Sequence, residues 1–323
     1  MKKFDNKFDR YPFSQLPKRP TYSWPNGAKL AVYFALNVEA FEFGRNPGPD
    51  FTSLPAAPFH RGFAYRDYGN RVGIWRILEL FNRYQIPLAI LTNTSVYDIC
   101  PEVLVPFRER GDEFVGHGRS NSERQSTLTV EAETRLIAEA TQILTQAEGK
   151  PPQGWLSPWI AESAQTPDLL VEAGYGYTLN WCMDDQPIWM HTRAGRLLAI
   201  PYPQEINDIP AIVARKDGAA QFADMIIDNF DEMLDQSKRQ SLVYGIAIHT
   251  FLIGQPFRLR HFRRALEHIE RHRDQVWIAT SGEIALNHHI FKEKMTYDPV
   301  KELVPVALIG ILPCVVVVAS NSQ

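Results

Sequence analysis

Residues 29–39 read KLAVYFALNVE, a mostly apolar run of strand length that closes on Asn37 and Glu39. Seven further apolar runs of strand length follow along the chain, with amphipathic segments of helical length and short turns between them. This alternation predicts a parallel α/β architecture, and seven or eight such units fit a barrel better than an open sheet. The predicted strands are residues 29–37, 87–93, 113–116, 153–156, 177–181, 197–201, 242–250 and 275–280.

Between the predicted strands, apolar residues recur at helical spacing in three stretches. Stripes of this kind are the buried faces of amphipathic helices. Their members are Ile74, Ile77, Leu78 and Phe81, then Leu136, Ile137, Ala140, Ile143 and Leu144, and finally Phe262, Leu266 and Ile269. Thr129, followed by Glu131 and Glu133, predicts an N-cap and an acidic first turn for the second of these helices.

Composition and charge favour an enzyme-sized protein that acts on a small molecule. The 323 residues are 45% hydrophobic, which is enough for a large core. The 34 Lys and Arg residues are dispersed among 37 Asp and Glu residues, so the chain offers no basic surface for nucleic acid or an anionic membrane. Three cysteines without CxxC spacing argue against a disulfide framework. Because the N-terminus lacks a signal-peptide pattern, we expect a cytoplasmic protein.

We expect one domain with two irregular ends. Residues 29–292 carry the strand and helix pattern and form a single barrel domain. Residues 1–28 hold aromatic residues and prolines without periodicity, and we interpret them as an arm that wraps over the barrel or over a neighbouring subunit. Residues 293–323 include a proline-interrupted apolar run that is too short for a transmembrane helix. Since residues 297–307 resemble a stretch of periplasmic tricarboxylate-transporter receptors, we interpret this tail as a gene-fusion or reading-frame scar.

Polar side chains follow several predicted strands at their carboxyl ends. In a parallel α/β barrel these ends meet at one face, where catalytic residues lie. Asn37 and Glu39 end the first predicted strand. His117 and Asn121 follow the third strand, and His249 ends the seventh. We therefore expect these five side chains to converge on one pocket.

Residues 116–121 read GHGRSN, which looks like a metal-binding His-x-x-x-His motif with asparagine at its second position. Two histidines at that spacing can bind a divalent metal through their imidazole nitrogens. Asn121 offers only a weak, neutral amide oxygen in place of the second imidazole. This single difference decides whether the chemistry of the pocket can depend on a metal bound by this motif.

These residues carry a resemblance to the polysaccharide deacetylase superfamily, over residues 20–290. The resemblance implies an irregular (β/α)7 barrel. Metal-dependent members have two aspartates in one motif, a base and a metal ligand, and His-x-x-x-His in another. Asn37 stands at the position of the base and Glu39 at that of the ligand, while His117 matches the first histidine and Asn121 replaces the second. The last three would make a poor zinc site, so we expect no cofactor, with zinc or another divalent metal on Glu39, His117 and Asn121 as the alternative.

Longer strings resemble the branch of metal-independent allantoinases and cyclic-imide hydrolases. They are residues 68–76 (YGNRVGIWR), 116–118 (GHG), 154–155 (GW), 180–187 (NWCMDDQP), 201–202 (PY) and 207–208 (ND). The chain departs from the allantoinase pattern at residues 39–41 and 121–122, so the strings indicate the branch rather than the substrate. The resemblance also implies a homo-oligomer.

The resemblance implies hydrolysis of a non-peptide amide C–N bond, and the polar residues can be given roles in it. The reaction needs a base, an electrophile for the carbonyl oxygen and an acid for the leaving nitrogen. We expect Glu39 to be the base, with a pKa raised by burial, and His249 to be the acid or oxyanion partner. His117 can share either role. Asn37 and Asn121 would donate amide N–H groups to a substrate carbonyl.

Further side chains are candidate substrate contacts, each with a structural alternative. They are Tyr68, Arg71, Trp155, Trp159 and Asp185. Arg71 could clamp a substrate carboxylate or carbonyl, or it could pair with Asp67. An aspartate pair in a loop, such as residues 184–185, is often solvated, and tryptophans at strand ends often close a barrel.

Three functions from different classes follow from these expectations. The first is a hydrolase that cleaves a C–N bond in a small cyclic or linear amide of the imide or ureide class, with a carboxylate to activate water and a histidine as acid or electrophile. The second is a metal-dependent carbohydrate N-deacetylase, with a place in carbohydrate metabolism. The third is a ligand-binding pseudoenzyme. The sequence favours the first.

Overall fold

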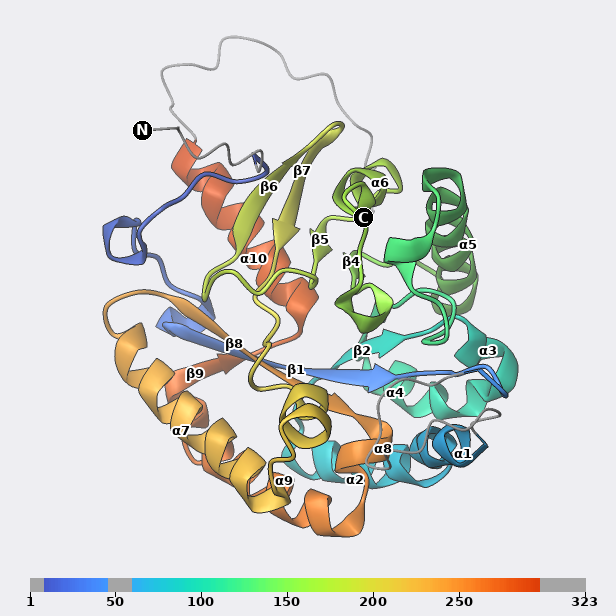
Figure 1. The fold of residues 1–323 in the computed structure, drawn as a ribbon. Helices are drawn as coiled ribbons and strands as arrows, with labels where there is room; N and C mark the ends of the chain where they lie inside the picture. The colour runs from blue at the N-terminus through green and yellow to red at the C-terminus, as the bar shows by residue number, and fades with distance from the viewer. Residues whose placement is uncertain (1–8, 46–59, 297–323) are drawn as a thin grey trace, which may run out of the picture.

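A computed structural model describes residues 9–45 and 60–296, apart from the side chains of residues 290–296 (Figure 1). Its centre is a sheet of nine strands, and the helices lie around this sheet. The strands are β1 (Leu30–Val38), β2 (Ala89–Thr92), β3 (Glu113–Gly116), β4 (Gly154–Trp155), β5 (Tyr177–Thr178), β6 (Ile188–Thr192), β7 (Gly195–Ala199), β8 (Leu242–His249) and β9 (Val276–Ile278).

The strand order confirms the predicted parallel α/β barrel. Strands follow the order β6-β7-β5-β4-β3-β2-β1-β8, and β9 pairs with the first residues of β1. Every neighbouring pair is parallel except β6 with β7. Asn207, in the segment after β7, forms an isolated parallel bridge with Ala247 of β8. This bridge brings the two ends of the sheet around a common interior, as in an irregular barrel.

Each of the eight predicted strands is present, with ends that differ by a few residues, but β6 was not predicted. β6 is an edge strand that lies antiparallel to β7 and is only partly buried. An edge strand of this kind lacks the continuous apolar run of a strand buried on both faces. β6 therefore gave no signal in a search for apolar runs.

β1 is buried along its whole length because it has one core on each side. Its even-numbered side chains pack in the core beneath the helices, whereas Ala31, Tyr33 and Ala35 pack in a second core inside the barrel. Side chains alternate along a strand, so Asn37 and Glu39 continue the inner row. The sequence of β1 thus directs these two polar side chains into the barrel at its carboxyl end.

β8 repeats this arrangement beside β1. Its even-numbered side chains belong to the outer core, and Val243 and Ala247 belong to the inner one. The pairing register sets Asn37 of β1 opposite His249 of β8. His249 therefore enters the barrel interior next to the polar end of β1.

The predicted helical stripes lie on α2, α5 and α9 and face the core, with Ile143 only half-buried. Thr129 is the N-cap of α5, and its side chain accepts a hydrogen bond from the backbone N–H of Ala132 at 3.3 Å. The helices are α1 (His60–Tyr68), α2 (Ile74–Tyr84), α3 (Ser95–Ile99), α4 (Val105–Arg110), α5 (Val130–Glu148), α6 (Thr166–Glu172), α7 (Ala219–Ser237), α8 (Thr250–Ile253), α9 (Pro256–Glu270) and α10 (Ser281–Thr296). A π-helical turn, Gly69–Gly73, joins α1 to α2.

The described part of the N-terminal arm, residues 9–28, lies on its own barrel. The backbone carbonyl of Arg10 accepts a hydrogen bond from the backbone N–H of His191 in β6. Arg10 and Arg19 form ion pairs with Asp168 at 2.9 Å and Asp184 at 2.6 Å. These contacts hold residues 10 and 19 of the arm against the barrel.

The predicted C-terminal tail lies outside the described residues except for its first residues, which end α10. Its interpretation as a fusion or reading-frame scar stays a prediction. Within the described part of the chain, no helix has the length and apolar character needed to cross a membrane.

The close approach of the π-helical turn to α8 generates a prediction about stability. A Cβ atom on Gly73 would lie 2.1 Å from the backbone oxygen of Thr250, the residue after His249. We expect Gly73→Ala to lower the free energy of unfolding by about 1–3 kcal/mol, because backbone atoms must shift. Urea unfolding measures this change. Gly176→Ala is the control, since its Cβ would meet no atom closer than 3.8 Å; equal stability losses in the two variants would contradict the prediction.

Candidate active site

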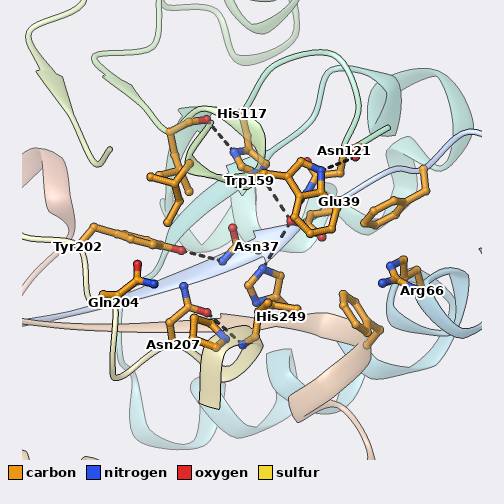
Figure 2. Close-up of a pocket in the computed structure, with 16 residues that line it drawn as sticks. Asn37, Glu39, Arg66, His117, Asn121, Trp159, Tyr202, Gln204, Asn207 and His249 are labelled. Atoms are coloured by element: carbon orange, nitrogen blue, oxygen red, sulfur yellow. Dashed lines mark hydrogen bonds and ion pairs between the residues drawn. The ribbon is translucent and has the colours of Figure 1, made fainter. Parts of the chain in front are cut away.

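A cavity of about 350 Å³ opens at the carboxyl ends of β1, β3 and β8. Figure 2 shows the side chains that surround it. Six of the residues expected from the sequence line this cavity: Asn37, Glu39, His117, Asn121, Trp159 and His249. The first, third and seventh predicted strands therefore converge on one pocket in the structure, as expected.

Glu39 is at the centre of this group. Its side chain is buried, and its Oε1 atom lies 3.5 Å from Nε2 of His117 and 3.5 Å from Nε2 of His249. The amide nitrogen of Asn121 donates a hydrogen bond to the same oxygen. One carboxylate oxygen thus meets two imidazoles and one amide.

His249 is held by a second carboxylate on its far side. Its Nδ1 lies 2.6 Å from Oδ1 of Asp208, and its backbone N–H donates to Oδ2 of Asp208 at 2.8 Å. Asp208 is fully buried, so both of its oxygens are committed to His249 in a medium of low dielectric constant. This contact fixes the ring orientation and directs Nε2 toward Glu39.

His117 is oriented by the backbone instead. Its Nδ1 lies 2.7 Å from the carbonyl oxygen of Leu156, and a carbonyl can only accept, so Nδ1 carries a proton. The other ring nitrogen, Nε2, faces Glu39. The two histidines therefore differ, because one lies beside a carboxylate and the other beside a neutral carbonyl.

Charge in this network corrects the expectation for Glu39. Burial alone would raise the pKa of Glu39, as expected from the sequence, but the two histidines outweigh burial and lower it to about 2. Burial likewise lowers the pKa of His249, but Asp208 and Glu39 outweigh it and raise it to about 10. Near neutral pH, Glu39 is thus a carboxylate and His249 an imidazolium.

The two asparagines make different contacts from those expected. The amide nitrogen of Asn37 donates to the hydroxyl of Tyr202 and to the carbonyl of Ile248, both at 3.2 Å. Asn121 donates to Glu39 and accepts from Asn93 at 3.1 Å. Their amide nitrogens are therefore engaged with the protein: that of Asn121 contacts Glu39, and that of Asn37 contacts Tyr202 and β8.

Trp159 forms one wall of the cavity in an unusual backbone conformation. Trp159 and Ile160 are both in the left-handed region, with φ of 64° and 55°. The indole N–H donates to the backbone carbonyl of Asn121 at 2.7 Å, and the guanidinium of Arg124 lies over the ring at 5.2 Å. These contacts offset the conformational cost of the turn.

Four expected substrate contacts do not line this cavity. Arg71 is exposed and forms an ion pair with Asp67 at 2.5 Å, the alternative expected for an arginine one helical turn away. The hydroxyl of Tyr68 accepts a hydrogen bond from Arg76. Trp155 is a core residue whose indole N–H is directed toward Gln125 and Ser157. Asp185 lines a different hollow, behind Tyr202.

The comparisons with known proteins agree with this geometry. No family model matches the chain. The "Putative polysaccharide deacetylase" of Schizosaccharomyces pombe is 26% identical over 297 residues, which span 82% of this chain and 92% of that protein. The peptidoglycan deacetylase of Helicobacter pylori is 24% identical over 294 residues, which span 80% of this chain and 95% of that protein. The crystal structure of PuuE allantoinase superposes with a TM-score of 0.77 at 26% identity, covering 86% of this chain and 97% of that one.

The chain is similar to proteins of the polysaccharide deacetylase superfamily over most of its length and shares their fold. This confirms the resemblance read from residues 20–290 and the irregular barrel that it implied. Relatives of both kinds, deacetylases and an allantoinase, match the chain over most of their length. This similarity therefore does not choose between their substrates.

The metal site of the metal-dependent superfamily members does not fit the side chains present here. Asn121 turns its amide nitrogen toward Glu39 and its oxygen toward Asn93, so the position of the second histidine supplies a donor rather than a ligand. Within residues 9–45 and 60–289, no group of three or more His, Cys, Asp or Glu side chains has the arrangement to hold a metal ion. The orientation of Asn121 therefore does not suit the metal site of Glu39, His117 and Asn121 that was considered from the sequence.

Several residues in this cavity were not singled out from the sequence: Arg66, Tyr202, Gln204 and Asn207, together with Asp208 behind His249. Tyr202 and Asp208 lie in strings that carried the resemblance, 201–202 and 207–208, but nothing in the spacing joined Asp208 to a histidine 41 positions away. Arg66 lies one residue before Asp67, in a stretch where only Arg71 was considered.

The opposite shifts of Glu39 and His249 predict how stability depends on pH. The contribution of His249 is complete below its ordinary pKa of 6.5 and is lost as pH rises toward 10. The contribution of Glu39 is present above its ordinary pKa of 4.5 and is lost as pH falls toward 2. Urea unfolding between pH 2 and pH 10 should show the highest stability between about pH 4.5 and 6.5, where both contributions are complete. A stability maximum outside that interval would contradict the charge assignment.

Removal of the buried partner of His249 should have a large effect. We expect Asp208→Asn to lower the pKa of His249 and to destabilise the protein by about 3–5 kcal/mol, since it leaves a buried imidazolium unpaired. NMR titration of the histidine and urea unfolding measure the two effects. The control is Asp231→Asn at the exposed pair of Asp231 with His268, also 2.6 Å apart. A small and equal effect in both variants would contradict the prediction.

Proposed function

We propose that this protein hydrolyses a non-peptide amide C–N bond in a small cyclic or linear amide of the imide or ureide class. The observation that carries the proposal is the pairing of an ionised Glu39 with a protonated His249 across 3.5 Å in a cavity of about 350 Å³. Curated relatives are deacetylases and a structural relative is an allantoinase, and both names describe hydrolysis of C–N bonds other than peptide bonds. These relatives support the class of reaction, and the imide or ureide substrate is the more specific part of the proposal.

The carboxylate and the imidazolium can divide the work of amide hydrolysis. Water attacks the carbonyl carbon and gives a proton to Glu39, while Nε2 of His249 gives its proton to the leaving nitrogen as the C–N bond breaks. The products are a carboxylic acid and an N–H compound (an amide from an imide, a urea from a ureide), which stay in one molecule when the substrate is a ring. Since Oε1 of Glu39 is 3.5 Å from Nε2 of His249, the proton can then return to the histidine.

The weak basicity of Glu39 is compatible with this role because its cause is the neighbouring positive charge. Burial favours the neutral acid, and the histidines hold the carboxyl ionised. As His249 loses its proton to the substrate, that charge disappears, and the pKa of Glu39 rises. Proton donation by the histidine and proton uptake by the carboxylate therefore assist each other.

The size of the cavity supports a small substrate. A volume of about 350 Å³ is at the lower end of the range for small-molecule sites. Its polar groups gather at Glu39 and the histidines, and Leu156, Ile209 and Phe251 supply apolar wall. A flat ring with one reactive amide fits this distribution of polar and apolar surface.

Substitution of the proposed acid and base tests the function. Glu39→Gln and His249→Gln should each lower kcat on cyclic imides or ureides by about 10²–10⁴-fold, with activity of the parent protein retained in chelator. Glu131→Gln and His268→Gln are the matched controls, because they change an exposed residue of α5 and a half-buried residue of α9 that lie outside the cavity. Thermal melting verifies that every variant is folded.

Two results would replace the proposed function with another, and a third would overturn the proposed mechanism. Bound zinc with chelator-sensitive cleavage of N-acetylated sugars would establish a carbohydrate N-deacetylase. Ligand-induced stabilisation without turnover of any amide would establish a binding pseudoenzyme. Full activity of Glu39→Gln and His249→Gln on a small amide would remove these side chains from the mechanism.

A further inference from the structure

We infer that Tyr202 and Asn207 select substrates that carry a second carbonyl group beside the amide that is cleaved, by donating hydrogen bonds to its oxygen. The inference rests on the proposed amide hydrolysis and adds the side chains that recognise the rest of the substrate. Both side chains line the same cavity as Glu39, and Figure 2 shows them on the same side of that carboxylate. Tyr202 is 3% exposed and Asn207 is 4% exposed, so both are buried polar groups of the cavity wall.

The side-chain amide of Asn207 offers a hydrogen-bond donor. Its Oδ1 atom accepts a hydrogen bond from the backbone N–H of Ile209 at 3.1 Å. Because a backbone N–H can only donate, this contact identifies the oxygen of the amide and leaves the nitrogen as its other end. Within residues 9–45 and 60–289, no acceptor meets that nitrogen. The N–H groups of Asn207 are therefore available to a ligand in the cavity.

The hydroxyl of Tyr202 offers a second donor. Its oxygen accepts a hydrogen bond from the amide nitrogen of Asn37 at 3.2 Å, and the same nitrogen donates to the backbone carbonyl of Ile248, which fixes the orientation of Asn37. Since Asn37 is the donor, the tyrosine proton is not used in this contact. Burial raises the pKa of Tyr202, so the hydroxyl keeps its proton. Among the groups that the structure describes, none accepts that proton.

Two donors beside the proposed acid and base suit the chemistry of an imide or acyl ureide. In both, the nitrogen of the bond that breaks carries a second carbonyl group. As the C–N bond breaks, negative charge on the leaving nitrogen spreads to the oxygen of that carbonyl until His249 delivers its proton. Donors at this oxygen stabilise the charge where it develops. A lactam lacks the second carbonyl and would leave Tyr202 and Asn207 without a partner in a buried site.

Two pairs of ring compounds isolate the second carbonyl. Succinimide and 2-pyrrolidinone share a five-membered ring, and glutarimide and 2-piperidone share a six-membered one. Within each pair, the imide has a carbonyl group where the lactam has a methylene group. Ligand-observed NMR titration with the full chain gives the dissociation constant of each probe and detects ring opening in the same sample.

We expect the parent protein to bind the imide of at least one pair about tenfold or more tighter than its lactam. Tyr202→Phe should weaken binding of that imide about fivefold and leave binding of the lactam unchanged, because only the imide uses the hydroxyl. Asn207→Asp, which keeps Oδ1 and replaces the donor nitrogen with an oxygen, should have the same selective effect. Tyr175→Phe is the matched control, because Tyr175 is also 3% exposed but lies outside the cavity.

Equal affinity within both pairs, no binding of any probe by the folded parent protein, or an imide preference that survives in both variants would each overturn the inference. An equal weakening of imide and lactam in the variants would also overturn it, since that result indicates general damage to the cavity. The parent ratio does not depend on whether the variants fold. Selective binding of imides without hydrolysis of any imide or ureide would sustain this inference and overturn the proposed function. Hydrolysis of imides with equal affinity for imide and lactam would do the reverse.

Discussion

The parallel pairing of β1 with β8 is the constraint on which the rest of the site depends. Their register runs from Leu30 opposite Leu242 to Asn37 opposite His249 without interruption. A slip of one residue would turn every side chain of one strand to its other face, exchanging the inner and outer cores. The two cores make that slip costly, because both faces of β1 are filled with apolar side chains. Hydrophobic packing along two strands therefore fixes the position of the catalytic candidates at their ends.

The electrostatic order of the cavity follows from this geometry. Glu39 and Asp208 lie on opposite sides of the His249 ring, so the imidazole is enclosed by two carboxylates. The same burial that would neutralise each group alone makes their mutual attraction strong. His117, beside a carbonyl, does not share this environment. Two histidines in one cavity thereby have different electrostatic surroundings without any difference in their own chemistry.

The sequence predicted what local patterns encode and missed what depends on contacts between distant segments. Apolar runs located eight strands, and the polar residues after them led to Glu39, His117 and His249. The pKa of Glu39 was expected to move in the wrong direction, since burial was visible in the pattern and the pairing of His249 with Asp208 was not. Arg66 and Arg71 show the same limit within one segment. Five residues in a helix turn through about 500°, so one arginine faces the cavity while the other faces solvent.

The contact between Arg10 and His191 has a consequence for the sheet as a whole. β6 is the last strand of the sheet in this direction, and its backbone N–H and C=O groups would otherwise form an open edge. Open edges invite pairing with the strands of other molecules. Arg10 thus covers part of this edge, and a chain shortened past this residue would expose it to edge-to-edge pairing even with its catalytic cavity intact.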